Sequence, residues 1–387
     1  MRLPRITLAA CKRHRGHPPQ SKSRLSLLAL KKSTCWSTSP AALLRECAEQ
    51  GEGQISPEFL RCQIEATTRV CRTLGEARAD LARLRRIVVD VCAKYGIAPI
   101  AASTHPFSPA TQQLRTDKER YFALLSEMQA TARRMVICGM HVHVGIDDNE
   151  LRIDLMNQLA YFVPHLLALS CSSPFWEGEQ TGLMSFRMTV FNSLPRTGLP
   201  ERFASYDEFR SQLNTMIRNG LIEDTSKIWW DVRPSARYAT LETRVMDCCT
   251  RIDDSIAIAA LIVCLLRMLY RLRNANLRWR DYPNMLIAEN RWRAMRYSTD
   301  DKLLDLAKGE LVDFSQLLEE IIEQIRPDAA ALDCVKEVAH ARTILRRGTS
   351  AHGQILVFEQ ARRSGATQRE ALKAVVDWLR IETAMGV

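Results

Sequence analysis

Hydrophobic and polar positions follow two different periods along the chain, and from about residue 55 segments of the two kinds succeed one another. A period of two is typical of a half-buried strand, and a period near 3.6 is typical of an amphipathic helix. The pattern predicts strands at 59–67, 97–103 and 135–146, a hairpin at 228–234 and 239–246, and helices at 74–95, 117–134, 149–169 and 206–219. From residue 253 nearly every segment has the helical period, with breaks expected near Pro283, Gly309, Pro327 and Gly348.

The strand predicted at 135–146 contains the sharpest local pattern of the chain, ICGMHVHVGIDD. Side chains alternate between the faces of a strand, so His141 and His143 share one face while Val142 and Val144 share the other. Two histidines on one face can ligate a metal or bind a phosphate or carboxylate. For an isolated pair, a solvated face with ordinary hydrogen bonds is the commoner outcome, and the pair alone does not settle the choice.

Three other predicted strand segments repeat this design. Glu65 lies on the first, Asp231 and Arg233 share a face of one hairpin arm, and Glu242 and Arg244 share a face of the other. Hard carboxylate oxygens hold Mg²⁺, and arginine forks hold phosphates or a substrate carboxylate. Taken together, the segments favour Mg-nucleotide chemistry on one sheet face. An exposed face with surface ion pairs is the alternative.

The net charge of +10 is concentrated near the start of the chain, where residues 1–40 hold nine Lys and Arg side chains and no acid. The first carboxylate is Glu46, and the remainder of the chain carries about +1. A protein that binds nucleic acid through charge needs a basic face on its folded body. We therefore expect small-molecule substrates and no nucleic-acid partner.

Twelve cysteines are scattered through the chain without a C-x-x-C pair, and many lie in apolar runs. Such thiols are typical of buried residues in a reducing compartment, so neither a disulfide framework nor a zinc site is expected. The longest apolar run, at 256–269, is interrupted by charge at both ends and fits a buried helix better than a membrane span. We therefore expect a cytoplasmic protein with no membrane partner.

Seven blocks of the sequence carry a resemblance. The longest are GMHVHVGI, SSPFWEGEQTGLMSFR and WWDVRPSARYATLETRVMD, and the others are ISPEFLRCQIE, STHPF, AENRWRAMRY and GTSAHGQ. In sequence and in order these blocks resemble the signature blocks of the glutamate–cysteine ligase type 2 family, which consists of bacterial ATP-dependent carboxylate–amine ligases. The resemblance runs from about residue 41 to the end, so 41–387 is expected to form one ligase domain.

The resemblance implies an α+β fold like that of glutamine synthetase, in which an antiparallel sheet forms a cup with helices packed behind it and a helical carboxy-terminal region. It also implies weak glutamate–cysteine ligase activity. ATP phosphorylates the γ-carboxylate of glutamate in this reaction, and the amine of cysteine attacks the acyl phosphate to give γ-glutamylcysteine, ADP and phosphate. The physiological amine is often unknown in the family, and a homodimer is one expectation for the oligomeric state. An ATP–Mg phosphotransferase and a non-catalytic nucleotide-binding module on the same fold are the alternatives.

The residues expected to carry this chemistry come from the blocks quoted above. Arg233 and Arg244 are predicted to be catalytic clamps for phosphate or substrate, and Glu65 and Glu242 to be Mg²⁺ ligands. Nucleotide or substrate contacts are predicted for four further residues, His141, His143, Asn290 and Arg293. A helix cap and a surface charge are the alternatives for the last two. ATP and Mg²⁺ are therefore the expected cofactors.

The family begins with a strand that reads approximately G-[IV]-E-E-E-Y-L-L-V-D, whereas this chain has LALKKSTCWSTSP at 28–40. Codons compatible with residues 30–40 give EEEYLLVDLA when they are read one base back. We interpret residues 1–40 as an aberrant or disordered leader, translated out of frame, in place of a strand of the site sheet and its glutamates. A targeting peptide is the alternative. Loss of the strand would impair activity and expose a sheet edge.

Overall fold

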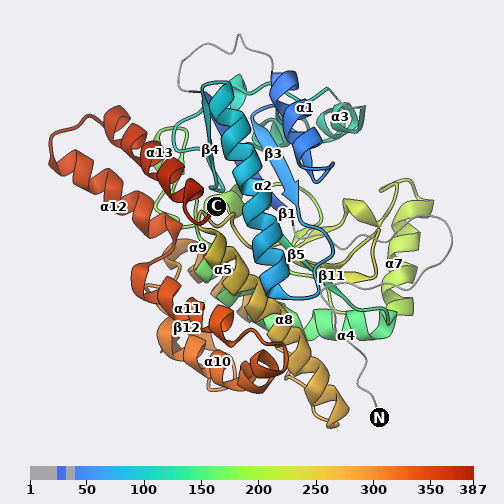
Figure 1. Cartoon of the computed structure of the whole chain (residues 1–387). Helices are drawn as coiled ribbons and strands as arrows, with labels where there is room; N and C mark the ends of the chain where they lie inside the picture. Colours follow the sequence, from blue (N-terminus) through green and yellow to red (C-terminus); the bar gives the residue numbers. More distant parts are fainter. Residues whose placement is uncertain (1–23, 32–39, 118) are drawn as a thin grey trace.

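A seven-stranded antiparallel sheet lies at the centre of the computed structural model, which describes residues 24–31, 40–117 and 119–387 (Figure 1). Its strands are β1 (Arg24–Lys31), β2 (Ile55–Pro57), β3 (Gln63–Thr67), β4 (Ile97–Ile100), β5 (Met140–Gly145), β10 (Val232–Pro234) and β11 (Thr240–Thr243). They pair in the order β10-β11-β5-β1-β3-β2, and β4 also pairs with β1. Because every one of these pairings is antiparallel, the sheet confirms the predicted α+β architecture.

Helices pack behind one face of the sheet. The long helices α2 (Leu74–Lys94) and α8 (Ile252–Asn274) lie side by side, and α13 (Gln368–Ala384) packs against β4 (Figure 1). The apolar side of the strands, which includes Ile64, Val142 and Leu241, is buried in the core. Burial of apolar surface is the main favourable contribution to folding, so this layer fixes the register of the strands. The polar side chains of these strands therefore lie on the opposite face of the sheet.

One helix among the described residues, α8, is long and apolar enough to cross a membrane. However, 78% of its most apolar window is buried inside the molecule. Helices α2, α10 (Phe314–Ala331) and α11 (Val335–Arg347) pack against it. In this fold α8 is therefore the central core helix, as the run at 256–269 predicts.

The remaining elements surround this centre. The other helices are α1 (Pro40–Gln50), α3 (Glu119–Arg133), α4 (Asn149–Leu159), α5 (Val163–Ser170), α6 (Arg187–Phe191), α7 (Tyr206–Arg218), α9 (Asn284–Tyr297) and α12 (Ser350–Arg363). Three short strand pairs complete the list: β6 (Phe175–Trp176) with β7 (Glu179–Gln180), β8 (Thr197–Gly198) with β9 (Trp229–Trp230), and β12 (Lys302–Asp305) with β13 (Glu310–Asp313). The ten cysteines in the described residues are all buried and free.

The helix predicted at 74–95 is confirmed as α2, and its ends show why. The side chain of Thr73 accepts a hydrogen bond from the backbone N–H of Glu76, which caps the start. Gly96, with a φ of +66°, follows the last turn and adopts the left-handed conformation that ends many helices.

One prediction for the carboxy-terminal half is wrong: Pro327 does not break a helix but lies inside α10. The break predicted near Gly309 is confirmed, and the segment there forms the turn of the β12–β13 hairpin, which the helical period did not indicate. The helix predicted at 149–169 also consists of two helices, α4 and α5, which a 3-10 turn at Ala160–Phe162 separates.

The structure has a strand, β1, at the position in the sheet where the interpretation of residues 1–40 predicts that a strand is missing. Strand β1 pairs with β3 on one side and with β5 and β4 on the other, so Ser26 is opposite Glu65 and Arg24 is opposite both His141 and Thr67. The expected exposed edge between β3 and β5 is therefore absent from the described sheet. The sequence of β1, RLSLLALK, contains no acid. Most of the segment that carries the frame hypothesis, 32–39, lies outside the described residues.

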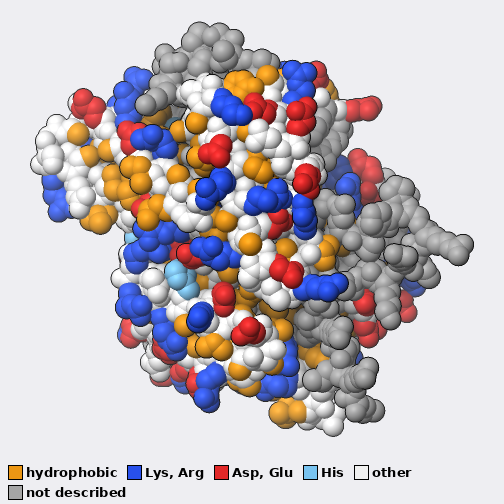
Figure 2. Space-filling view, viewed as in Figure 1, with side chains coloured by type: hydrophobic (Ala, Val, Ile, Leu, Met, Phe, Trp, Pro, Cys, Tyr) orange, Lys and Arg blue, Asp and Glu red, His pale blue; other side chains and the backbone are white. Residues whose placement is uncertain are grey.

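Charge is mixed over the surface. Figure 2 shows acidic and basic side chains interspersed across the visible face of the described part of the molecule. Many of them form exposed ion pairs, such as Arg342 with Glu319 at 2.7 Å. This distribution agrees with the small net charge of the chain beyond residue 40 and gives no support to charge-driven nucleic-acid binding.

Candidate functional site

A buried carboxylate, Glu242, is the centre of the polar cluster on the sheet. Its Oε2 accepts a hydrogen bond from Nε of Arg233 at 2.9 Å, and its Oε1 is paired with Nη1 of Arg244. The Nδ1 atom of His141 lies 3.5 Å and the Nε2 atom of His143 lies 3.6 Å from the same Oε1. The structure thus brings together five of the eight predicted site residues, and we call them the Glu242 cluster.

The strand register builds the cluster directly. Glu242 of β11 is opposite His143 of β5 on one side and Arg233 of β10 on the other. His141 is two residues before His143 and therefore shares its face. The period-two pattern in the sequence predicts this convergence, and here it is confirmed.

Local bonds hold the members of the cluster in place. Nδ1 of His143 shares a hydrogen bond with Oγ1 of Thr240 at 3.0 Å, which fixes the ring. Arg233 also donates to the carbonyl oxygen of Ser226 at 3.1 Å. Nη1 of Arg244 lies 3.4 Å from Nδ1 of His141.

Electrostatics keep Glu242 ionised although it is buried. Burial alone raises the pKa of a carboxyl group, but the positive charges of Arg244, His143 and Arg233 outweigh that effect and hold the pKa of Glu242 well below its ordinary value. Two guanidinium groups then face one carboxylate, so the cluster keeps an excess of positive charge. The buried Nε of Arg244 has no hydrogen-bond partner among the described residues. A site with a spare buried N–H donor and excess positive charge suits a substrate oxyanion.

Glu65 lies on the same face as the cluster but not within it. It belongs to β3, and β1 separates β3 from β5. The register places Glu65 opposite Ser26, while Thr67, two residues further on, is opposite Arg24 and so in line with His141. The two predicted metal ligands, Glu65 and Glu242, therefore lie on different strands but on the same face of the sheet.

The described residues do not fit Mg²⁺ in this arrangement. No group of three His, Cys, Asp or Glu side chains among them could hold a metal ion. Both oxygens of Glu242 face guanidinium groups, and like charge disfavours a cation beside them. The metal-ligand roles of Glu65 and Glu242 stay predictions.

Asn290 and Arg293 lie on α9 and bind a different element. The amide of Asn290 donates to the carbonyl oxygen of Leu304 at 2.8 Å and accepts from its N–H at 2.7 Å. Arg293 donates to the carbonyl oxygen of Lys302 at 2.6 Å and pairs with Asp301 at 2.9 Å. These bonds attach α9 to β12, and none of the described ones reaches the Glu242 cluster. Because the hydrophobic pattern does not indicate β12, this structural role of Asn290 and Arg293 was not predictable from it.

Asp231 is not part of the Glu242 cluster either. It is fully buried, and Arg291 of α9 donates to its Oδ2 at 2.7 Å and to its Oδ1 at 3.2 Å. The pair joins α9 to the strand that carries Arg233 and so supports the cluster from behind. Arg291 lies in the block AENRWRAMRY, one residue after Asn290, and the substrate-contact roles of Asn290 and Arg293 stay predictions.

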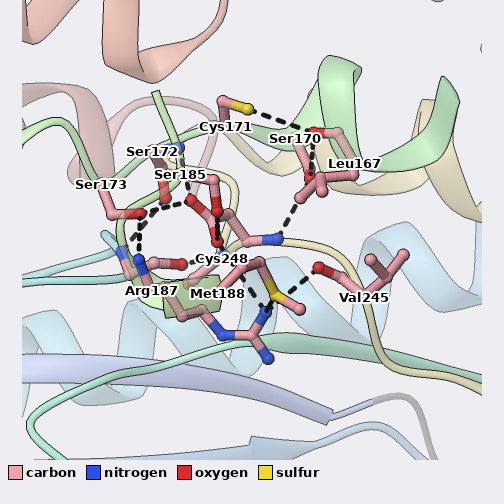
Figure 3. Close-up of polar contacts among 12 residues, drawn as sticks. Leu167, Ser170, Cys171, Ser172, Ser173, Ser185, Arg187, Met188, Val245 and Cys248 are labelled. Atoms are coloured by element: carbon pink, nitrogen blue, oxygen red, sulfur yellow. Dashed lines mark hydrogen bonds and ion pairs between the residues drawn. The ribbon is translucent and has the colours of Figure 1, made fainter. Parts of the chain in front are cut away.

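A second buried carboxylate, Asp247, lies close to the cluster in the chain. It accepts hydrogen bonds from the N–H of Ser172 at 2.9 Å and from the hydroxyls of Ser173 at 2.7 Å and Ser185 at 2.9 Å. Figure 3 shows the three serines gathered beside Arg187. Ser172 and Ser173 are fully buried, and their hydrogen bonds to Asp247 fix the backbone at this point.

Comparisons with known proteins assign the chain to a family. The sequence model described as Glutamate-cysteine ligase family 2 (GCS2) matches residues 13–377. A relative from Rhodospirillum rubrum, named "Putative glutamate--cysteine ligase 2", is 56% identical over 348 residues, which are 89% of this chain and 90% of the relative. A relative of the same name from Paracoccus denitrificans is 50% identical over 340 residues, 88% of this chain and 90% of that one.

Solved structures share the fold. A glutamate–cysteine ligase from Francisella tularensis in complex with AMP has a TM-score of 0.65 at 15% identity, and the match covers 94% of this chain and 89% of that one. A bifunctional glutathione synthetase from Pasteurella multocida has a TM-score of 0.64 at 14% identity, and the match covers 94% of this chain but 53% of that one. The chain therefore belongs to glutamate–cysteine ligase family 2, and it is a ligase of the class that forms carbon–nitrogen bonds.

Proposed function

We propose that the chain is an ATP-dependent carboxylate–amine ligase that joins the γ-carboxylate of glutamate to the amine of cysteine or of a related small molecule in the cytoplasm. The observation that carries this proposal is the Glu242 cluster, in which two guanidinium groups and two imidazoles converge on one buried carboxylate. The family supports the reaction class, and the AMP bound by the Francisella ligase of the same fold supports a nucleotide as the second substrate.

The proposed reaction has two steps. A carboxylate oxygen of glutamate attacks the terminal phosphorus of ATP, the bond to ADP breaks, and an acyl phosphate forms. The amine nitrogen then attacks the acyl carbon, the carbon–oxygen bond to phosphate breaks, and the nitrogen releases a proton as the amide forms. Neither step uses a covalent protein nucleophile, and positioning and charge stabilisation are the catalytic contributions that remain.

The cluster is suited to this contribution. Negative charge accumulates on the phosphoryl oxygens in the first step, and Arg233 and Arg244 are placed to stabilise it from a site that is shielded from water. Glu242 holds both guanidinium groups in a fixed geometry, so little reorganisation is needed when the substrate binds. His141 and His143 are proposed to donate to substrate or nucleotide oxygens beside the two arginines.

The test is a coupled assay of ADP release by the full chain with ATP, Mg²⁺, glutamate and cysteine. A ligase releases ADP rapidly only when acid and amine are both present, and hydroxylamine should trap the acyl phosphate as a hydroxamate. Arg244→Gln should lower kcat by about 10²-fold or more, because it removes a charged donor aimed at the transition state. Fast ADP release with one substrate alone would support a phosphotransferase, and calorimetric ATP binding without turnover would support a binding module; either result contradicts the proposal.

A further inference from the structure

We propose that Arg187 is a positioning residue for the reaction: it holds the backbone of Arg244 and thereby keeps the Arg244 guanidinium in the Glu242 cluster. This inference rests on the proposed function only for its catalytic consequence. The positional part, that Arg244 leaves Glu242 when Arg187 is replaced, can be tested without any activity.

The Arg187 side chain is buried and is directed at the chain immediately behind the cluster. Its Nη1 donates to the carbonyl oxygen of Val245 at 3.1 Å, and its Nη2 donates to the carbonyl oxygen of Arg244 at 3.3 Å. Figure 3 shows the guanidinium directed toward Val245. One planar fork thus binds two consecutive carbonyl oxygens, a geometry that arginine provides and lysine does not.

The backbone at Arg244 needs such support because β11 ends at Thr243. The continuous ladder with β5 ends there, and pairing resumes only at Met246 and Asp247, opposite Met140 and Gly139. Among the described bonds, the carbonyl of Arg244 accepts none from β5. On the other side, the N–H of Arg244 donates to the carbonyl oxygen of Asp231 at 2.7 Å. Arg244 is therefore fixed at its N–H by Asp231, the residue before β10, and at its carbonyl by Arg187.

Arg187 is itself held in a close-fitting socket. The Asp247 carboxylate accepts hydrogen bonds from Ser172, Ser173 and Ser185, and its Oδ1 lies 3.8 Å from Nη1 of Arg187. The hydroxyl of Ser173 also accepts the backbone N–H of Arg187 at 3.1 Å. Gly139 lies directly against the guanidinium, since a Cβ at that position would be 2.2 Å from Nη2. The whole arrangement fixes the guanidinium plane, and with it the two carbonyl oxygens.

The molecule offers a matched control in Arg85. This side chain is also fully buried, and it donates to the carbonyl oxygens of Cys249 and Thr250, in the same connecting segment but five or six residues beyond Arg244. Loss of either fork leaves buried carbonyl oxygens unsatisfied, and the two losses should cost comparable stability. Only the loss of Arg187 releases a residue of the cluster.

The experiment compares Arg187→Lys with Arg85→Lys in the full chain. We expect R187K to lower kcat by about 10²-fold, because a displacement of about 1 Å in a positioned group costs that much, whereas R85K stays near the wild-type rate. In combination with Arg244→Gln, R187K should add almost no further loss, since the group that it positions is already missing. Equal losses in R187K and R85K, or losses that follow only their melting temperatures, would overturn the positioning role.

A crystal structure of R187K gives the readout that does not depend on activity. We expect Arg244 to have lost its contact with Glu242 while Arg233 keeps its own. An unmoved Arg244 refutes the inference even if the enzyme is impaired. If the wild-type chain shows no ligase turnover, the proposed function fails, and this structure still decides whether Arg187 positions Arg244.

Discussion

Glu242 is the residue on which the charge balance of the cluster depends. Glu242→Gln leaves two buried guanidinium groups without a counter-charge, and removal of one partner of a buried pair costs about 3–5 kcal/mol. The expected result at neutral pH is a large loss in the free energy of unfolding, measured by chemical denaturation. The exposed pair Arg342–Glu319 provides the control, because Glu319→Gln should cost less than about 1 kcal/mol.

The same substitution has a defined pH dependence. The pKa of Glu242 is held well below its ordinary value of 4.5 in the folded chain, so its stabilising contribution is complete above that pH and is lost as the pH falls toward the folded pKa. The stability difference between wild type and E242Q should therefore shrink on acidification below 4.5. A difference that stays constant would show that Glu242 is not preferentially ionised by the fold.

His105 should give a sensitivity of the same sign at milder pH, so that stability again falls on acidification. Its Nδ1 accepts backbone N–H groups from Phe107 at 3.1 Å and Ser108 at 2.8 Å, and burial lowers its pKa from 6.5 to about 3. The unfolded chain then binds a proton that the folded chain does not, so stability falls by about 1.4 kcal/mol per pH unit as the pH drops below the unfolded pKa. His105→Gln should remove this slope in denaturation curves between neutral and mildly acidic pH; an unchanged slope would contradict the assignment.

At the scale of elements, the sequence predicts those helices and strands whose formation depends on local signals. Helix α2 and the His141–His143 strand were predictable because capping residues and a period of two are local signals. The helix break predicted at Pro327 is wrong because tertiary contacts stabilise α10 beyond this residue. The next residue, the fully buried Asp328, pairs with Arg267 at 2.6 Å and with Arg271 at 2.8 Å. The roles of Arg187 and Asp247 were not predictable, because they depend on which distant carbonyl oxygens the fold brings within reach.

Strand β1 gives a prediction of its own. It lies inside the sheet, between β3 on one side and β5 and β4 on the other, so deletion of residues 1–31 should leave two unpaired edges. Such edges favour aggregation and loss of cooperative folding. Deletion of residues 1–23 is the matched control, since it keeps β1 and should preserve the melting transition in calorimetry. If both truncated chains fold equally well, β1 contributes nothing to the sheet.

At the scale of the whole molecule, the question is whether the central strand, β1, carries the side chains that the proposed reaction uses. The register places β1 between Glu65 and the Glu242 cluster, and β1 contains no acid. The family strand G-[IV]-E-E-E-Y-L-L-V-D would bring three glutamates to the same sheet. Because Mg²⁺ prefers carboxylate oxygens, we propose that such glutamates would hold the metal in a chain that carried them.

We therefore predict that a chain whose leader is replaced by the one-base-shifted reading turns over ATP faster than the chain as written. Each 1.4 kcal/mol of added transition-state stabilisation is worth about tenfold in rate, so a restored metal site should raise kcat by well over that factor. The measurement is the coupled ADP assay with glutamate and cysteine on both proteins, with Mg²⁺ titrated in each. The shifted version should reach half-maximal turnover at a lower Mg²⁺ concentration than the present chain. Equal turnover and equal Mg²⁺ dependence in the two proteins would show that RLSLLALK serves the site as it stands and that the frame hypothesis is wrong.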